Sequence, residues 1–246
     1  MFSLLFAISF VAIFFYSFIK SNIKIVYFAA MSLSFWGANF GYIGLNIDLS
    51  RLFALLSLCF LIFKIKNIRL STKQTLSILI LLLMWIAPLS VGLSNAYLIP
   101  DYGYGLAQSP EVRPIVQLIQ RISYLSLFLL PFILSKNNSR RFADITIKGY
   151  LVGTTIQVIL GLYQVTAYKI NLPLWDYGYG QLQFVNGIAR VNALGGEPRH
   201  LAMFLLPSTV YLLFNLAFTK NFSLFSKNTT RLMFIGHFVV LFLTFS

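Results

Sequence analysis

Charged residues are scarce in this sequence. They make up 10% of its 246 residues, and only six of them are acidic, whereas 58% of the residues are hydrophobic. Soluble globular domains carry about 25% charged residues, so the composition excludes an ordinary soluble enzyme or binding domain. Together with a mean hydropathy of +0.80, it is typical of a polytopic membrane protein.

Cysteine and the motifs of soluble enzymes are equally rare. The single cysteine, Cys59, lies within an apolar run, which excludes an internal disulfide and predicts a small core residue. The sequence contains no glycine-rich phosphate loop, no His-Glu-x-x-His or Gly-x-Ser-x-Gly motif, and no His/Cys cluster with metal-ligand spacing. We therefore expect neither a metal nor a cofactor. The chemistry has to come from polar side chains in loops and along helices.

Long apolar runs are what the sequence has instead. They predict an all-α, polytopic fold of about eight transmembrane helices, in a single domain that covers residues 1–246. The expected helices are 2–19, 25–45, 50–63, 74–98, 114–135, 145–168, 200–219 and 231–246. Because the last run is too short for a full span, we expect the protein to be truncated at its C-terminus.

The basic residues follow the predicted loops. Thirteen of the 19 Lys and Arg residues lie in or beside every second loop, and five of the six acids lie on the other side. The positive-inside rule then places the N-terminus and the loop 169–199 of this multi-pass membrane protein outside the cytoplasm. The net charge of +13 is thus topological. We expect membrane lipids as partners and no nucleic acid.

The densest group of reactive side chains directly precedes the apolar run 201–218. Pro198 is well suited to the first position of a helix, where its missing N–H costs nothing. A helix that starts there gathers the neighbouring side chains at its N-terminal end, where free amides and the helix dipole favour an anion. This predicts a phosphate-bearing substrate at the membrane surface. The residues concerned are Arg190, Glu197, Arg199 and His200.

A polar stripe follows the expected helix 114–135. Its members recur with helical spacing and so share one face; they are Arg113, Gln117, Gln120, Arg121 and Tyr124. Arg121 would lie about 10–12 Å below the outer end of the helix. An arginine at that depth needs a wet cavity or a partner, so we expect a water-accessible cavity open to the outside. A snorkelling arginine or a structural pair is the alternative.

Helix 145–168 carries two further patterns. Gln157 and Gln164, seven residues apart on one face, favour the same external cavity, whereas Gly149 and Gly153 are typical of close helix packing. His237, in the last apolar run, has no polar neighbour in the sequence, and we expect it to be structural or interfacial rather than catalytic.

The outer loops contain a short repeat, Asp-Tyr-Gly-Tyr-Gly, at 101–105 and 176–180. Its tyrosines and carboxylates suit sugar binding, but tyrosine is also common at membrane interfaces. Both interpretations stay open.

The C-terminal quarter of the chain resembles a known family. The resemblance rests on Arg190, the Gly-Gly-Glu-Pro segment ending at Pro198, the continuation Arg199-His-Leu-Ala-Met-Phe-Leu-Leu-Pro207 and the ending Leu-Thr-Phe-Ser246. Over about residues 185–246 these resemble the bacterial O-antigen polymerase and O-antigen ligase superfamily, which includes capsular and exopolysaccharide polymerases. Members of the family often carry an Arg-x-x-Gly-x-x-x-Glu-Pro-like segment. In this chain the glycine of that segment is displaced to Gly195 and Gly196, and Arg199 replaces the small polar residue often found after the proline.

That resemblance implies a GT-C-like, metal-independent, inverting glycosyltransferase at the outer face of the cytoplasmic membrane, acting in surface polysaccharide biosynthesis. Its donor would be a polyprenyl-diphosphate-linked glycan, and its acceptor another glycan or lipid. The residues are compatible with this chemistry. Arginines stabilise a departing diphosphate by bidentate contacts, and an acceptor hydroxyl needs a base. The candidate diphosphate ligands are Arg190, Arg199, Arg121 and Arg113; the candidate bases are Glu197 and His200.

Two other classes of function compete with this interpretation. A transporter or flippase of lipid-linked sugars would usually bury acids within its helices and contain internal repeats, and neither pattern is present in the sequence. A non-catalytic membrane subunit would leave the polar stripe of helix 114–135 without a role. The sequence does not distinguish a polymerase from a ligase.

Overall fold

A computed structural model describes residues 12, 16, 22–35, 49–64, 72–94, 112–134, 139–172, 183–185, 188–193, 198–218 and 224–245. Its elements are α2 (Asn22–Ser32), α3 (Leu49–Lys64), α4 (Thr72–Ser94), α5 (Arg113–Leu134), α6 (Ser139–Lys169), β1 (Gln183–Val185), β2 (Ile188–Arg190), α7 (Pro198–Phe218) and α8 (Lys227–Phe245). The Asp-Tyr-Gly-Tyr-Gly repeats, Glu197 and all but two residues of the expected helix 2–19 lie outside the described residues.

The described part is almost entirely helical, as the sequence predicts. Within it, three helices are long and apolar enough to cross a membrane, namely α6, α7 and α8. This supports a helical membrane protein, whereas the bundle of eight spans and its GT-C-like arrangement stay predictions. Apolar side chains along α4 are exposed, including Leu79, Leu83 and Val91, as expected for a surface that meets lipid.

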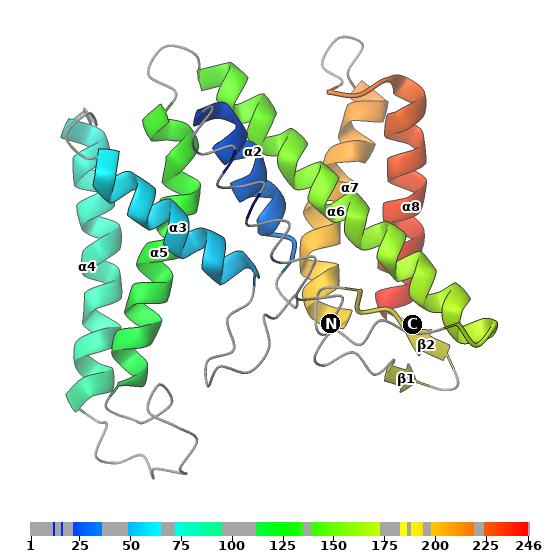
Figure 1. Ribbon diagram of the computed structural model, residues 1–246, viewed down its shortest axis with the longest axis horizontal. Helices are drawn as coiled ribbons and strands as arrows, with labels where there is room; N and C mark the ends of the chain where they lie inside the picture. The colour runs from blue at the N-terminus through cyan, green and yellow to red at the C-terminus, as the bar shows by residue number, and fades with distance from the viewer. Residues whose placement is uncertain are drawn as a thin grey trace.

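The helix ends alternate between the two ends of the molecule (Figure 1). The C-terminal ends of α3, α5 and α7 lie at the top of this view with the N-terminal ends of α4, α6 and α8, and the opposite ends of these helices, except for the shorter α3, lie toward the bottom. This is the arrangement of a chain that runs back and forth, as the alternating loops predict. α6 runs diagonally across the view, from the top of α5 to the lower right, and passes α7 and α8 on the way. It contacts α2 and α5 as well as α7 and α8.

The helices end where local hydrogen bonds satisfy the backbone. At the end of α6, Asn171 adopts a positive φ of 53°, and the N–H of Leu172 donates to the carbonyl of Ala167 at 2.8 Å, which is the Schellman pattern. At the start of α8, the Ser226 hydroxyl accepts the N–H of Thr229 at 3.2 Å, as an N-cap residue does.

α2 ends earlier than the sequence predicts. The expected helix was 25–45, whereas α2 ends at Ser32 and turns through Ser34 to Phe35. The hydroxyls of Ser32 and Ser34 donate to the carbonyls of Ala29 and Met31, each at 2.8 Å. The Met31 carbonyl also accepts the N–H of Ser34 at 3.3 Å, so these hydroxyls compete with backbone N–H groups for the last carbonyls of the helix.

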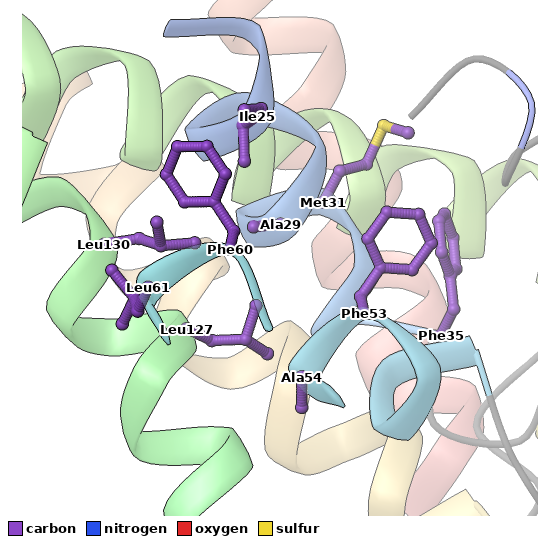
Figure 2. Packing of buried hydrophobic residues seen from close by; sticks show 10 residues of the cluster. All are labelled: Ile25, Ala29, Met31, Phe35, Phe53, Ala54, Phe60, Leu61, Leu127 and Leu130. Carbon is purple, nitrogen blue, oxygen red and sulfur yellow. The ribbon is translucent and has the colours of Figure 1, made fainter. Parts of the chain in front are cut away.

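One apolar cluster joins α2, α3 and α5 (Figure 2). The phenyl rings of Phe35, Phe53 and Phe60 are fully or almost fully buried in it, beside Leu127 and Leu130 of α5. The ring of each buried phenylalanine removes a large apolar area from contact with the surroundings and fills the space between helices. α2 also packs closely on α6, because a Cβ at Gly149 or Gly153 would collide with the backbone of α2. The predicted packing role of these glycines is confirmed.

A second cluster joins α6, α7, α8 and the segment after β2. Val158, Leu201, Leu205 and Val240 form its buried centre, so α6 is shared by both halves of the molecule. The expectation for Cys59 is wrong: its side chain is exposed on α3. Apolar periodicity cannot separate a core position from a lipid-facing one, because both are apolar.

Candidate functional site

A β-hairpin leads into the residues that the sequence singles out. β1 and β2 pair antiparallel, with Gln183 opposite Arg190 and Val185 opposite Ile188. The sequence analysis missed this hairpin. Its signal is the Asn-Gly pair at 186–187, which between two short apolar runs is the strongest local indication of a hairpin turn.

Arg190 and Val191 bind the C-terminal end of α8. The guanidinium of Arg190 donates through Nη2 to the carbonyl of Thr244 at 3.1 Å, and the N–H of Val191 donates to the carbonyl of Leu243 at 3.4 Å. The last carbonyls of a helix have no partner within it, and the negative end of its dipole attracts a cation. Arg190 therefore caps α8 as well as being a candidate ligand.

Gln164 of α6 holds the next two residues. Its Nε2 donates to Oδ1 of Asn192, and its Oε1 accepts the N–H of Ala193, each at 2.8 Å. All three residues are buried, and Ala193 has a positive φ of 43°, a conformation that alanine rarely adopts. The glutamine supplies the donor and the acceptor that this strained, buried turn needs.

These contacts place the segment 190–193 beside the first turn of α7. Pro198 begins that helix, as predicted, and is buried. Val191 and Ala193 belong to the same apolar cluster as Leu201 and Ala202, and Figure 1 shows β2, the start of α7 and the end of α8 at the same end of the molecule. The hairpin, α6, α7 and α8 thus converge at one place.

The first turn of α7 carries two of the predicted site residues. Arg199 is exposed and His200 is partly buried, and both make interactions within the protein. They bring a guanidinium group and an imidazole to the N-terminal end of a 21-residue helix, at the same end of the molecule as β2, which ends at Arg190. The N-terminal end of a helix favours an anion. Glu197, the third predicted member, lies outside the described residues.

Arg190 retains unused hydrogen-bonding capacity. Its Nε is buried and has no hydrogen-bond partner among the described residues. A buried donor without an acceptor is costly and calls for an explanation. A guanidinium presents five N–H donors in a planar fork that matches two oxygens of a phosphate. One of these donors is used on α8, which holds the side chain in place, and the buried Nε is a second donor with no acceptor among the described residues.

The polar stripe of α5 forms a separate group. Arg113, Gln117 and Arg121 are exposed, and Tyr124 is partly buried, with its hydroxyl 2.9 Å from the hydroxyl of Ser50 on α3. The four residues share one face of α5, as predicted. In Figure 1, however, α5 and the β2–α7 region lie on opposite sides of the molecule. The structure does not bring the stripe together with Arg190 and Arg199.

Gln157 and Gln164, which were expected to line the external cavity, are buried and connect parts of the protein. The Nε2 of Gln157 donates to the carbonyl of Ser34 at the end of α2, so this residue and Gln164 are buried anchors and do not line an open cavity. His237 is buried, as a structural histidine would be, and its Nε2 lies 3.0 Å from the hydroxyl of Thr154 on α6. Sequence reasoning missed that partner because it lies 83 residues away.

Comparisons of the chain with protein-family models, with curated proteins and with solved structures found no match. Among the described residues, no three His, Cys, Asp or Glu side chains are grouped as metal ligands. An interpretation of the site therefore rests on its own geometry.

Proposed function

We propose that this protein is a membrane glycosyltransferase that polymerises or ligates polyprenyl-diphosphate-linked oligosaccharides at the outer face of the bacterial inner membrane. The observation that supports it best is the anchoring of Arg190. One N–H of its guanidinium is bound to the carbonyl of Thr244, its Nε has no partner among the described residues, and the first turn of α7 adds Arg199 and His200.

Such an arrangement suits the departure of a diphosphate. Cleavage of the bond between a sugar and a diphosphate builds negative charge on the leaving oxygen, and fixed donors that need no reorganisation stabilise that charge most effectively. Arg190 and Arg199 would bind the diphosphate with bidentate contacts, assisted by the free amides of α7. No metal is needed for this stabilisation.

The acceptor hydroxyl needs a base close to the same place. Glu197 directly precedes Pro198 in the sequence, and His200 follows it by two residues. One of these groups would remove the proton of the acceptor hydroxyl as its oxygen bonds to the sugar carbon that the diphosphate leaves, and the other would orient that hydroxyl. The stripe of Arg113, Gln117, Arg121 and Tyr124 would bind a more distant part of the glycan, because it is separated from the diphosphate site.

The rival proposal of a transporter for lipid-linked sugars receives less support. Ion-coupled transporters usually bury carboxylates within the membrane. The only acid among the described residues is Asp144, and it is exposed near the start of α6.

The test is the length of the surface glycan in a host that lacks the native gene and carries variants of the complete gene. Arg190→Ala and Glu197→Gln should each shorten or abolish the polymer, and Arg199→Lys should also be impaired, because lysine keeps the charge but lacks the planar fork. Lys169→Gln, at the end of α6, is the matched control. Near-normal polymer from both Arg190→Ala and Glu197→Gln would overturn the proposal. Arg121→Ala should reduce activity with little loss of expression.

A further inference from the structure

A cleft of about 510 Å³ lies between α2, α6 and α7, away from the Arg190 segment. Its walls include Ala30 of α2, Ile147 and Tyr150 of α6, and Met203, Pro207 and Tyr211 of α7. Two of these three helices, α6 and α7, are long and apolar enough to cross a membrane. The cleft is therefore a recess within the part of the protein that lipid surrounds.

The cleft offers an occupant an apolar surface. Three hydroxyl groups in the walls of the cleft donate hydrogen bonds to backbone carbonyls. Thr146 donates to Phe142 at 2.7 Å, Tyr150 donates across to Phe204 of α7 at 2.8 Å, and Ser208 donates to Leu205 at 2.8 Å. Because a hydroxyl has one proton, these groups have none left to donate to a ligand. A hydrocarbon chain is the chemistry that fits such walls.

Basic residues lie at the end of the cleft nearer to the start of α6. The wall residues of α6 begin about 10 Å from its N-terminal end, at 1.5 Å per residue. Arg140 and Arg141 are exposed in its first turn, and Lys148 is exposed two turns further, with its Nζ 5.5 Å from the ring centre of Phe225.

α2 adds a fourth cation at this end. The backbone of Tyr27 lies against Gly149, and that of Met31 against Gly153, so α2 runs parallel to α6 and Lys24 lies level with the first turns of α6. Lys24 is exposed. Asp144 is the only acid among the described residues, and it lies near the cleft residue Tyr211. Four cations therefore face one described carboxylate at this end of the cleft.

We propose that this cleft binds an anionic phospholipid of the leaflet at the basic end of α6. An acyl chain lies between α2, α6 and α7, and the phosphate lies beside Arg140, which shares a face of α6 with the cleft residues Ile147 and Leu151. The charge of the surroundings determines this choice of occupant. Basic residues between membrane helices favour anionic headgroups, and guanidinium groups match phosphate oxygens. This site lies at the opposite end of the helices from Arg190, so it is independent of the proposed glycosyl transfer.

The experiment measures lipid retained by the purified full chain. The protein in zwitterionic detergent is incubated with phosphatidylglycerol or with phosphatidylcholine of the same acyl chains, and bound lipid is counted by native mass spectrometry. We expect at least about tenfold stronger retention of phosphatidylglycerol, which corresponds to about 1.4 kcal/mol. Arg140→Gln combined with Arg141→Gln should remove this preference, whereas Lys169→Gln at the other end of α6 should preserve it.

A second pair of variants tests the acyl chain. Met203→Trp adds bulk to the cleft wall and should reduce retention of both lipids, whereas Leu206→Trp, an exposed residue of α7 outside the cleft, should not. Equal retention of the two lipids by the unaltered protein, or a preference that survives loss of both arginines, would overturn the proposal. So would tighter binding of a polyprenyl phosphate that depends on Met203 but not on the arginines. The arginine variant changes exposed residues only, so it tests the proposal even if Met203→Trp fails to fold.

Discussion

The hydrogen bond of Arg190 has two structural consequences. It closes the end of α8 at the carbonyl of Thr244, and it limits where the rest of the guanidinium can point. The sequence indicates that Arg190 is important, because it stands beside other charged residues in an apolar chain. It does not indicate the capping role, because the partner is a backbone carbonyl 54 residues later.

The pair of His237 and Thr154 is a test of structural coupling at the residue scale. The Met233 carbonyl 2.7 Å from Nδ1 can only accept, so Nδ1 carries a proton, and in the neutral ring Nε2 accepts from Thr154. His237→Ala and Thr154→Val should each destabilise the protein. Combined, they should cost less than their sum by about 0.6 kcal/mol, the average for such bonds between membrane helices, and by no more than about 1.7 kcal/mol.

The measurement is unfolding of the purified single and double variants in detergent micelles. Thr155→Val is the matched control, because the Thr155 hydroxyl donates only along its own helix, to Leu151 at 2.7 Å. It should show no coupling with His237→Ala. Strictly additive effects of His237→Ala and Thr154→Val would contradict a hydrogen bond between α6 and α8.

At the scale of elements, α6 is hydrogen-bonded to four other parts of the protein. Its Tyr150, Thr154, Gln157 and Gln164 are hydrogen-bonded respectively to α7, α8, the end of α2 and the turn after β2. Each attachment is one polar side chain in an apolar setting, where an unsatisfied partner is costly. Loss of one attachment should therefore loosen one element and leave the others in place.

Gln164→Leu provides that test. The substitution removes the two hydrogen bonds that the Gln164 side chain makes to Asn192 and Ala193, so the segment that carries Arg190 should open more often. Trypsin should then cut after Arg190 several times faster than in the unaltered protein, because local opening controls cleavage. Gln157→Leu, which loosens α2 instead, should leave this rate unchanged. If Gln164→Leu does not accelerate cleavage after Arg190, the turn is held by other contacts.

Helices were easier to predict than their connections. The bounds of α3, α4, α5 and α7 differ from the expected ranges by a few residues, because apolar length and flanking polar residues determine where a helix meets the membrane surface. α2 ends early at a turn where serine hydroxyls compete with backbone N–H groups for carbonyls, and the hairpin before Arg190 depends on turn chemistry. Both are local signals that apolar periodicity overlooks.

At the scale of the whole molecule, the alternation of basic loops predicts an orientation. In a Cys59→Ser background, Lys169→Cys at the end of α6 should react with an impermeant maleimide in intact cells, because this end is expected outside. Asn228→Cys, exposed at the start of α8, should react only after permeabilisation. The reverse pattern would contradict the orientation and, with it, the outward location of the Arg190 site.

The sequence predicts which end of each helix lies on which side of the membrane, but not which helices are neighbours. The stripe on α5 and the Arg190 segment were both expected to serve one diphosphate, because both belong to the outer side. Figure 1 shows that they lie on opposite sides of the molecule. Lateral neighbours are determined by close packing, such as that of Gly149 and Gly153 on α2, and by polar pairs between distant residues, which a single sequence does not reveal.

The length of α6 has a consequence for the membrane around the protein. Its 31 residues extend for about 46 Å, whereas a bilayer's hydrocarbon core is about 30 Å thick. A helix of this length accommodates the difference by inclination and by protruding ends, so a thinner or thicker bilayer should alter its inclination. Because every attached element would follow, thermal stability should have an optimum among phosphatidylcholines of increasing chain length. An unchanged midpoint across that series would mean that neighbouring helices hold α6 at a fixed angle regardless of the lipid.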